Sequence, residues 1–343
     1  MQKDKVSVII PAYNASLTIE KCIRSVLSQI YSPIEIIVVN DGSKDNTLEI
    51  ITKINKETFG GIKIIDQKNN GVSEARNRAI AESTGKYICF LDSDDTYAAD
   101  YIENCTKLLF KYDVQMLVTA FNTVENNEII GRLDYISPEK TYISTSDYLD
   151  IMLNYHDQAY WGANWNKMYV ASIIKENRLK FQKGITIGED LYFNLQYLMY
   201  VDNIVVVHEP SQNYQIDTSG SLSKLKRNPL DYWKQYVLIY HLYLELCHKK
   251  QVPNIERLNA FAFRMIFETA YMTVVRSKAS FKQFKIFSKE NFELFLKSNQ
   301  IKTEKTLFLW RVIGKLIQKH HYLWAYVLIK IENCRRSMWK RVK

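Results

Sequence analysis

The run Tyr87-Ile88-Cys89-Phe90-Leu91 is followed directly by Asp92-Ser93-Asp94-Asp95. A short continuous apolar run is typical of a strand buried in a parallel sheet. The carboxylates at its end repel one another, and a cation that prefers hard oxygen ligands, Mg²⁺ or Mn²⁺, relieves that repulsion. Such an ion also keeps positions open for substrate phosphates. The segment therefore predicts a metal–diphosphate site at the end of a strand. The alternative is a solvated, Asp-rich turn.

Apolar strands and helices alternate through the first hundred residues. Strands are expected at 6–10, 34–39, 62–65 and 87–91. Helices are expected at 17–28 with Ser16 as the cap, after Asp45 or Asn46, and at 72–83, before Gly85. Successive βαβ units of this kind predict an α/β fold with a mostly parallel central sheet flanked by helices.

Polar residues follow each of these four strands. They are Tyr13-Asn14, Asp41-Gly42-Ser43, Asn70-Gly71 and Asp92 to Asp94. In an open α/β sheet, ligands bind beyond the carboxyl ends of the strands. The four segments are therefore expected to meet in one crevice.

The rest of the chain changes character twice. Residues 115–210 show shorter strands and single helices, with a helix expected after Gly188-Glu189-Asp190. From about residue 229 the sequence is helical and rich in aromatic residues. The expected domains are a catalytic domain at 1–222 and a helical C-terminal region at 223–343, which ends in a basic amphipathic tail at 301–343.

Three charged positions in the first domain have a functional and a structural interpretation. Asp41 could accept a hydrogen bond from the imide of uracil, or could stabilise an ordinary turn. Arg76, near the start of a helix, could reach nucleotide phosphates, or could pair with Glu74 or Glu82. Asp190 could remove a proton from a hydroxyl, or could stabilise a helix N-terminus.

Two further sets of residues are also candidates. Tyr160, Trp161, Trp165 and Tyr169 could stack on the C–H face of a sugar, or could pack in the core. The segment 219–223 (Ser-Gly-Ser-Leu-Ser) could cover bound phosphates, or could be a flexible linker.

The basic charge lies in the tail. Residues 301–343 hold seven Lys and four Arg against Glu304 and Glu332, so their net charge of +9 equals that of the whole chain. Basic helices with Trp and Leu faces commonly lie on anionic bilayers, and the alternative is a helix docked on the protein. No apolar run approaches a membrane span and no signal peptide is visible, so a cytoplasmic protein, peripheral on the inner face of the membrane, is expected.

Composition excludes several classes. The five cysteines are far apart without a CxxC motif, and no HExxH motif occurs, so neither a disulfide framework nor a zinc site is indicated. Because residues 1–300 are neutral overall, nucleic-acid binding by the whole protein is not expected.

Four motifs in order resemble one family. They are 6–14 (Val-Ser-Val-Ile-Ile-Pro-Ala-Tyr-Asn), 39–43 (Val-Asn-Asp-Gly-Ser), 70–77 with Asn70-Gly71 and Ala75-Arg76-Asn77, and 90–95 (Phe-Leu-Asp-Ser-Asp-Asp). The set resembles the family 2 inverting glycosyltransferases of the GT-A fold, especially bacterial capsule, exopolysaccharide and teichoic-acid enzymes. The resemblance covers about residues 5–225. It implies transfer of a sugar from a nucleotide-diphosphate donor, UDP-linked by family frequency, to a glycan or undecaprenyl-linked acceptor.

The resemblance also implies site residues. Those that bind the nucleotide sugar would be Pro11, Tyr13, Asp41, Asn70, Arg76, Asp92 and Ser93. Asp94 of the DxD motif would hold Mn²⁺ or Mg²⁺, and Asp190 would be the catalytic base. Glu189 and Trp161 would border the donor or acceptor pocket.

Two positions depart from the family pattern. Asn40 stands where many members have Asp, which leaves the role of Asp41 intact. Gln212-Asn213-Tyr214-Gln215 precedes Ser219 where many relatives carry Arg or His for the diphosphate, so the group that assists the leaving group is open, and Lys224 is one candidate.

The same residues also suggest other classes of protein. Asp92-Ser93-Asp94-Asp95-Thr96 fits the DxDxT motif of haloacid dehalogenase-type phosphatases, but that motif usually ends the first strand and needs a second acidic motif that Gly188-Glu189-Asp190 does not supply. A nucleotidyltransferase would need a Gly-rich loop after the first strand. A non-catalytic, membrane-associated nucleotide-sugar-binding protein also remains an alternative.

Overall fold

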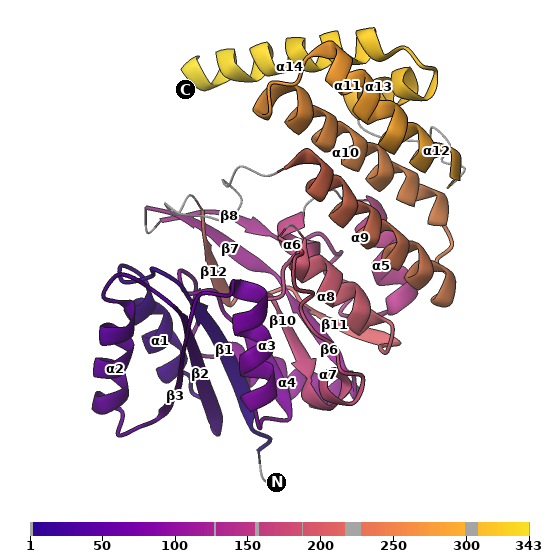
Figure 1. The fold of residues 1–343 in the computed structure, drawn as a ribbon. Coiled ribbons are helices and arrows are strands. Elements are labelled where there is room, and N and C mark those ends of the chain that lie inside the picture. The colour runs from indigo at the N-terminus through magenta and orange to yellow at the C-terminus, as the bar shows by residue number, and fades with distance from the viewer. Residues whose placement is uncertain are drawn as a thin grey trace. The chain divides into compact units, whose positions relative to one another are not determined.

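The computed structural model describes residues 3–126, 128–154, 158–186, 188–216, 228–298 and 308–342 (Figure 1). The chain forms two compact units. An α/β unit comprises residues 1–151 and 157–221, and a helical unit comprises residues 152–156 and 222–343.

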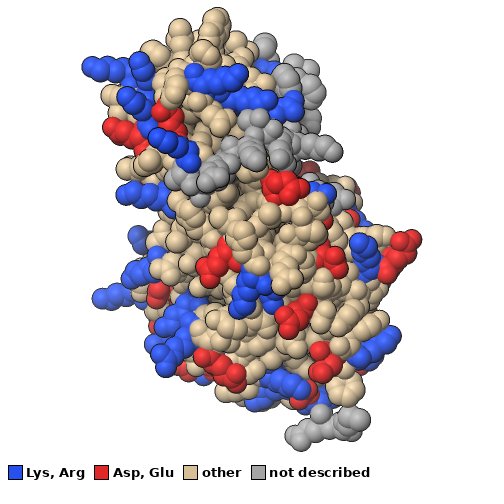
Figure 2. Space-filling view, turned by 90° about the vertical axis from the view of Figure 1, so that its right-hand side faces the viewer, with Lys and Arg blue, Asp and Glu red and all other residues tan. Residues whose placement is uncertain are grey.

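The helical unit consists of amphipathic helices that pack on one another. Its α-helices are α9 (Pro229–Lys249), α10 (Leu258–Tyr271), α11 (Phe281–Phe287), α12 (Leu294–Ser298), α13 (Phe308–Gln318) and α14 (Tyr322–Val342), with a 3₁₀ turn at Ile255–Arg257 and π-helical segments at Met272–Arg276 and Ser288–Glu293. Lys and Arg outnumber Asp and Glu on the part of its surface visible in Figure 2. None of the helices within the described ranges combines the length and the apolarity that crossing a bilayer requires.

The tail helices are docked within this unit. Ile313, Ile317 and Ile329 are buried, and α13 packs against α10 and α14. Gly314 permits the contact between α13 and α10, because a Cβ atom there would lie 2.0 Å from the ring of Phe263. The docked-helix alternative therefore describes α13 and one side of α14.

The α/β unit is built on an eight-stranded sheet of order β3-β2-β1-β4-β10-β6-β11-β9. These strands are β1 (Val6–Ala12), β2 (Ile34–Asp41), β3 (Ile62–Gln67), β4 (Tyr87–Phe90), β6 (Met116–Thr119), β9 (Tyr142–Ser144), β10 (Lys167–Val170) and β11 (Asn203–Val207). Strands β3, β2, β1 and β4 are mutually parallel, as predicted, whereas β10 runs antiparallel between β4 and β6.

A second sheet and the helices that precede α9 in the described residues complete the unit. The four-stranded sheet has the order β5-β12-β7-β8, with β5 (Thr96–Tyr97), β7 (Phe121–Glu125), β8 (Glu128–Leu133) and β12 (Gln212–Gln215). The helices are α1 (Ile19–Leu27), α2 (Thr47–Glu57), α3 (Val72–Glu82), α4 (Tyr101–Tyr112), α5 (Thr145–Asn154), α6 (Gln158–Gly162), α7 (Ala171–Glu176) and α8 (Glu189–Leu198).

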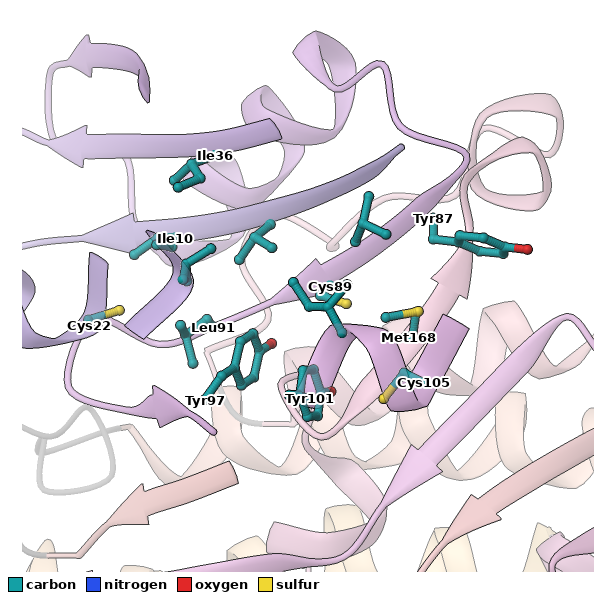
Figure 3. Packing of buried hydrophobic residues seen from close by; sticks show 14 of the residues in the cluster. Ile10, Cys22, Ile36, Tyr87, Cys89, Leu91, Tyr97, Tyr101, Cys105 and Met168 are labelled. Carbon is teal, nitrogen blue, oxygen red and sulfur yellow. The ribbon is translucent and has the colours of Figure 1, made fainter. Parts of the chain in front are cut away.

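The central strands β1, β2 and β4 of the first sheet are largely buried because both of their faces are covered. On one face, side chains such as Ile10 and Ile36 pack with Cys22 of α1 and Cys105 of α4 (Figure 3). On the other face, α3 contacts β1 and β2. This burial explains why these three strands contain continuous apolar runs rather than alternating ones.

Several predicted boundaries and caps differ in the structure. Strand β2 extends to Asp41, so that carboxylate belongs to the strand end. Helix α1 begins at Ile19, and its N-cap residue is Thr18 rather than Ser16, whose backbone N–H donates to Asp45 Oδ2 (3.1 Å). At the start of α2, of the two predicted residues, Asn46 is at the N-cap position without a side-chain bond, and Asp45 accepts from Thr47 N–H at 3.1 Å.

Candidate functional site

The carboxyl ends of β1, β2 and β3 are joined by hydrogen bonds between the segments that follow them. The backbone N–H of Asn14 donates to Ser43 Oγ (3.0 Å), which connects the loops after β1 and β2. Asp41 accepts from the backbone N–H groups of Asn70 (2.9 Å) and Gly71 (2.8 Å), which connects β2 to the loop after β3. Three of the four polar segments predicted to meet are therefore bonded to one another, and the fourth follows β4, which runs parallel to β1.

Asp41 holds the loop after β3 in place. Its side chain is buried and also accepts from Gln67 Nε2 at 2.8 Å. The loop can approach because Gly42 has a φ of +70° and lies against the backbone of Asn69, where a Cβ atom would come within 2.6 Å of the amide nitrogen. In the structure the Asp41 carboxylate is thus engaged by protein donors, as its turn-stabilising interpretation predicts.

The predicted nucleobase residues differ in accessibility. The Tyr13 side chain is 48% exposed and Asn70 is exposed, whereas Pro11 is buried as part of β1. Tyr13 and Asn70 thus present surface at the strand ends to which a planar ring could bind.

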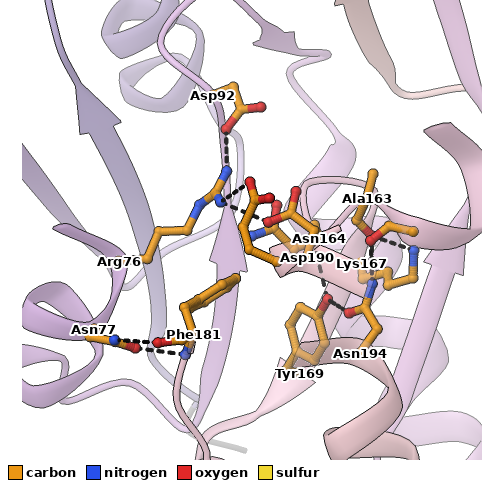
Figure 4. A network of polar contacts seen from close by, with 12 residues as sticks. Arg76, Asn77, Asp92, Ala163, Asn164, Lys167, Tyr169, Phe181, Asp190 and Asn194 are labelled. Carbon is orange, nitrogen blue, oxygen red and sulfur yellow. Dashed lines mark hydrogen bonds and ion pairs between the residues drawn. The ribbon is translucent and has the colours of Figure 1, made fainter. Parts of the chain in front are cut away.

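Arg76 connects two carboxylates that are far apart in the sequence. It lies on α3 and is 3% exposed. Its Nη1 donates to Asp190 Oδ1 at 2.7 Å and its Nη2 donates to Asp92 Oδ1 at 2.9 Å (Figure 4). Glu189 Oε1 lies 3.8 Å from Nη1. The alternative pairing of Arg76 with Glu74 or Glu82 is wrong, because Arg76 pairs with Asp92 and Asp190, and Glu82 pairs with Lys63 and Arg78.

Charge and burial act in opposite directions on this cluster. Burial alone would lower the pKa of Arg76, but Asp190, Asp92 and Glu189 together raise it. Burial raises the pKa of Asp190, the Arg76 guanidinium opposes that rise, and the charges of Glu189 and Asp92 add to it. A carboxyl group with a raised pKa is a candidate general base.

Asp190 is presented by the first turn of α8. Gly188 precedes the helix with a φ of +68°, which favours glycine, and α8 begins at Glu189. The helix therefore points its N-terminus, with Glu189 and Asp190, at the guanidinium of Arg76.

The acidic segment after β4 divides into two parts. Asp92 and Asp94 are half-buried, whereas Asp95 is buried and accepts from the backbone N–H of Gln215 (2.9 Å). Burial, with the charges of Asp92 and Asp94, raises the pKa of Asp95 well above its ordinary value. Asp95 thus ties the segment to β12, whereas Asp92 and Asp94 remain partly exposed to solvent.

Comparison with known proteins identifies the family. Residues 7–169 match the family model described as Glycosyl transferase family 2. This stretch, about half of the chain, is thus a family 2 glycosyltransferase domain. The chain is 31% identical over 229 residues to Glycosyltransferase GlyA of Streptococcus pneumoniae, a match that covers 65% of this chain and 32% of GlyA.

Two further similarities extend the comparison. Over 136 residues the chain is 35% identical to the Escherichia coli enzyme named UDP-Glc:alpha-D-GlcNAc-diphosphoundecaprenol beta-1,3-glucosyltransferase WfgD, covering 39% of this chain and 52% of WfgD. The matched region is thus about a third of the length of GlyA and half that of WfgD. The structure of S. aureus TarS 1–349 in complex with UDP-GlcNAc has a TM-score of 0.73, covers 97% of this chain and 92% of that chain, and is 18% identical, which establishes the GT-A fold.

The oxygen ligands of this family 2 protein fit a divalent ion. No three His, Cys, Asp or Glu side chains within the described ranges are grouped closely enough to hold a metal unaided. Mg²⁺ is usually bound by one or two carboxylates and completed by water and substrate phosphates. The half-buried pair Asp92 and Asp94 matches that ligand set.

A buried network behind Asp190 was not predicted from the sequence. Lys167 is fully buried, and its Nζ donates to Tyr160 O (3.1 Å), Ala163 O (2.5 Å) and Asn166 Oδ1 (2.8 Å). Three donors are matched by three acceptors, as an ammonium group requires. Burial lowers the pKa of Lys167 to about 7, and the charge of Asp190 opposes that shift.

The same network holds the helix that carries Asp190. Asn194, one turn further along α8, donates to Gly162 O (2.7 Å) and Ala163 O (3.0 Å) and accepts from the Tyr169 hydroxyl (2.6 Å; Figure 4). The signal in the sequence was the polar group Asn164, Asn166 and Lys167 among aromatic residues.

The aromatic candidates lie in the interior. The side chains of Tyr160, Trp161, Trp165 and Tyr169 are buried. Trp165 stacks on Tyr214 with ring centroids 4.8 Å apart, and Trp161 contacts the ring of Tyr148 at 5.3 Å. The faces proposed for sugar stacking are therefore covered by protein in this structure.

The candidate phosphate-covering segment 219–223 and Lys224 lie outside the described residues. Strand β12, which leads towards them, is anchored at Gln215 by Asp95.

Proposed function

We propose that this family 2 protein is an inverting glycosyltransferase that moves a sugar from a UDP-sugar to a hydroxyl group of a glycan or lipid-linked glycan, in the synthesis of cell-surface polysaccharide. The observation that carries the proposal is the bridge by which Arg76 joins Asp92, in the DxD motif, to Asp190 on α8. The bridge connects the predicted diphosphate end of the crevice to the predicted base.

The nucleotide would occupy the strand ends. Tyr13 and Asn70 would contact the uracil and ribose from the exposed side, and Pro11 and Asp41 would shape the pocket beneath them. Asp41 is buried and already bonded to the loop at Asn70, so we expect it to read the uracil imide after a small rearrangement of that loop. UDP is favoured because TarS is described with UDP-GlcNAc and WfgD is named for UDP-Glc.

Mn²⁺ or Mg²⁺ would be held by Asp94, with Asp92 and Ser93 on the side of the donor. When bound, such an ion acts as a Lewis acid that stabilises the negative charge of the departing diphosphate. Arg76, whose guanidinium is desolvated, would add a second positive charge at the same end of the crevice.

Asp190 would act as the base in a single displacement. An acceptor hydroxyl attacks the anomeric carbon from the face opposite the diphosphate, the bond from that carbon to the diphosphate oxygen breaks, and Asp190 takes the hydroxyl proton. Attack from the opposite face inverts the anomeric centre. Glu189, 3.8 Å from Arg76, would help to keep the guanidinium in place.

The acceptor and the location follow from different observations. WfgD is named for a diphosphoundecaprenol acceptor, and the tail of this chain carries a net charge of +9. We therefore infer a lipid-linked acceptor and a peripheral position at the inner face of the cell membrane.

A panel of nucleotide sugars tests the proposal. The protein is incubated with UDP-, GDP- and dTDP-sugars, with Mn²⁺ and after chelation, and release of the nucleotide is measured. Metal-stimulated release from a UDP-sugar is expected. Release of phosphate from sugar phosphates, without release from any nucleotide sugar, would instead support the DxDxT phosphatase alternative. Binding of UDP without turnover in the presence of acceptor extracts would support a binding protein.

A further inference from the structure

Helix α14 is apolar on two opposite sides. Its inner side, with Tyr322, Ala325 and Ile329, is buried against the helical unit. On its outer side, Leu323 is 52% exposed, Trp324 is 62% exposed and Ile331 is 57% exposed. Large exposed apolar patches mark interaction sites. The outer side of α14 is therefore a candidate interaction surface.

Spacing places these exposed residues on one stripe. Leu323, Val327 and Ile331 are separated by four residues each, and Trp324 adjoins them. Side chains four apart lie on the same helix face. We call Leu323, Trp324, Val327 and Ile331 the outer stripe of α14.

The charges around the outer stripe are positive. Lys330 and Arg335 are exposed beside it. The one acidic residue of α14, Glu332, is buried and paired with Arg335 (2.7 Å). The stripe is thus rimmed by positive charge without an exposed carboxylate on the same helix.

The neighbouring helix α11 extends the basic surface. It packs beside α14 through Phe281 and Phe284, whose rings lie 5.9 Å and 5.7 Å from that of Tyr326. Its residues Lys282 and Lys285 are exposed, as is Lys289, which follows it. The part of the helical unit visible in Figure 2 is correspondingly rich in Lys and Arg.

We propose that the outer stripe of α14 lies flat on an anionic lipid bilayer, with Trp324 at the level of the headgroups and with Lys330 and Arg335 of α14 and Lys282 and Lys285 of α11 at the lipid phosphates. A second copy of the chain is a poorer occupant, because it would bring an equally basic surface against this one. Tryptophan in an apolar stripe flanked by cations is typical of interfacial helices. The inference deepens the proposed function and rests on it, because an enzyme that acts on a lipid-linked acceptor has to reach the membrane.

Vesicle binding by the full chain tests the inference. Phosphatidylcholine vesicles with and without phosphatidylglycerol are sedimented with wild type, with Leu323→Ser/Trp324→Ser, and with Lys330→Gln/Arg335→Gln. The matched control is Leu238→Ser, which removes a 42% exposed leucine from α9. Circular dichroism and thermal unfolding establish that each variant is folded.

Wild type and Leu238→Ser are expected to bind the anionic vesicles alike. The Leu323→Ser/Trp324→Ser variant should bind about tenfold more weakly than wild type. The Lys330→Gln/Arg335→Gln variant should bind at least about tenfold more weakly at low salt, and its difference from wild type should shrink as the salt concentration rises. Equal binding by wild type and the Leu323→Ser/Trp324→Ser variant would overturn the inference. So would a concentration-dependent dimer of wild type, abolished in that variant, with no vesicle binding.

The same samples keep the two proposals apart. Hydrolysis of the UDP-sugar in solution is expected to be unchanged in the Leu323→Ser/Trp324→Ser and Lys330→Gln/Arg335→Gln variants. If wild type hydrolyses no nucleotide sugar yet binds vesicles through the stripe, the proposed function fails and the docking surface stands. If wild type hydrolyses the nucleotide sugar but the stripe substitutions do not change its vesicle binding, only the proposed docking surface is refuted.

Discussion

Replacing Arg76 with Gln should move the pH dependence of turnover. Arg76 donates to Asp190 at 2.7 Å and opposes the rise that burial causes in the pKa of Asp190. A general base acts in its deprotonated form, so turnover should increase with pH through the pKa of Asp190. Because Gln carries no charge, the pKa of Asp190 should rise further in the variant, and the acid limb of the kcat profile should move to higher pH.

The magnitude follows from the separation of the charges. An N–O distance of 2.7 Å places the two charge centres about 4 Å apart, where the interaction is about 4 kcal/mol at an effective dielectric constant of about 20, or about 3 pKa units. The Asp190 side chain is 20% exposed, and solvent screening reduces this value. A shift of about 1 to 3 units is therefore expected, which lowers kcat about 10-fold to 1,000-fold at pH values below the limb.

The assay is kcat measured at saturating UDP-sugar and acceptor across pH, so that any loss of nucleotide affinity does not enter. Arg78→Gln is the matched control, since Arg78 lies on the same helix and pairs with Glu82 at the surface. Its profile should coincide with that of wild type. An Arg76→Gln profile that is lower at every pH but keeps the wild-type limb would refute the claim that Arg76 tunes Asp190.

Three further substitutions test other parts of the account. Asp94→Asn should abolish stimulation by Mn²⁺, with a loss on the order of 10²-fold in kcat; full activity after chelation would remove the metal role. Lys167→Met removes three buried hydrogen bonds, although Ala163 O keeps its bond from Asn194 and Tyr160 O its bond from Asn166, and should lower the free energy of unfolding by about 3 kcal/mol, measured in urea against exposed Lys63→Met; equal stability of the two would contradict the network. Gly314→Ala forces a methyl group into the ring of Phe263 and should destabilise the protein by about 1–3 kcal/mol. A raised melting temperature would contradict the packing of α13 on α10.

The first four strands and their shared edge could be predicted because each step depends on local sequence. Strands buried on both faces are continuous apolar runs, and parallel strands bring their carboxyl ends to one edge, so Asp41 and Asp92 could be placed without knowing any contact. The boundaries moved by a few residues, as with Asp41, where the hydrogen-bonding ladder continued past the apolar run.

The bridge made by Arg76 could not be predicted in the same way. Arg76 and Asp190 are separated by 114 residues, and they meet only because β10 and α8 return to the sheet next to β4. Local sequence suggested nearer partners, and those pairings were wrong. The buried network at Lys167 was missed for a similar reason, because a lysine surrounded by backbone carbonyls leaves no periodic pattern.

The tail shows a third limit. Its composition indicated an amphipathic helix with one apolar face to be covered by either protein or lipid. In the structure α14 has two apolar faces, and its inner face, with Ala325 and Ile329, is covered by the helical unit. Packing partners decide which face remains outside, and composition carries no information about them.

The central claim is that Asp190 is the base of a sugar transfer at the nucleotide site. The most direct measurement compares Asp190→Asn with wild type in two quantities, the affinity for UDP with Mn²⁺ by calorimetry and the rate of transfer from the UDP-sugar. UDP affinity should change by less than about twofold, while the rate falls on the order of 10² to 10⁴-fold. An unchanged rate, or a loss of UDP binding that accounts for the whole loss of rate, would contradict the assignment.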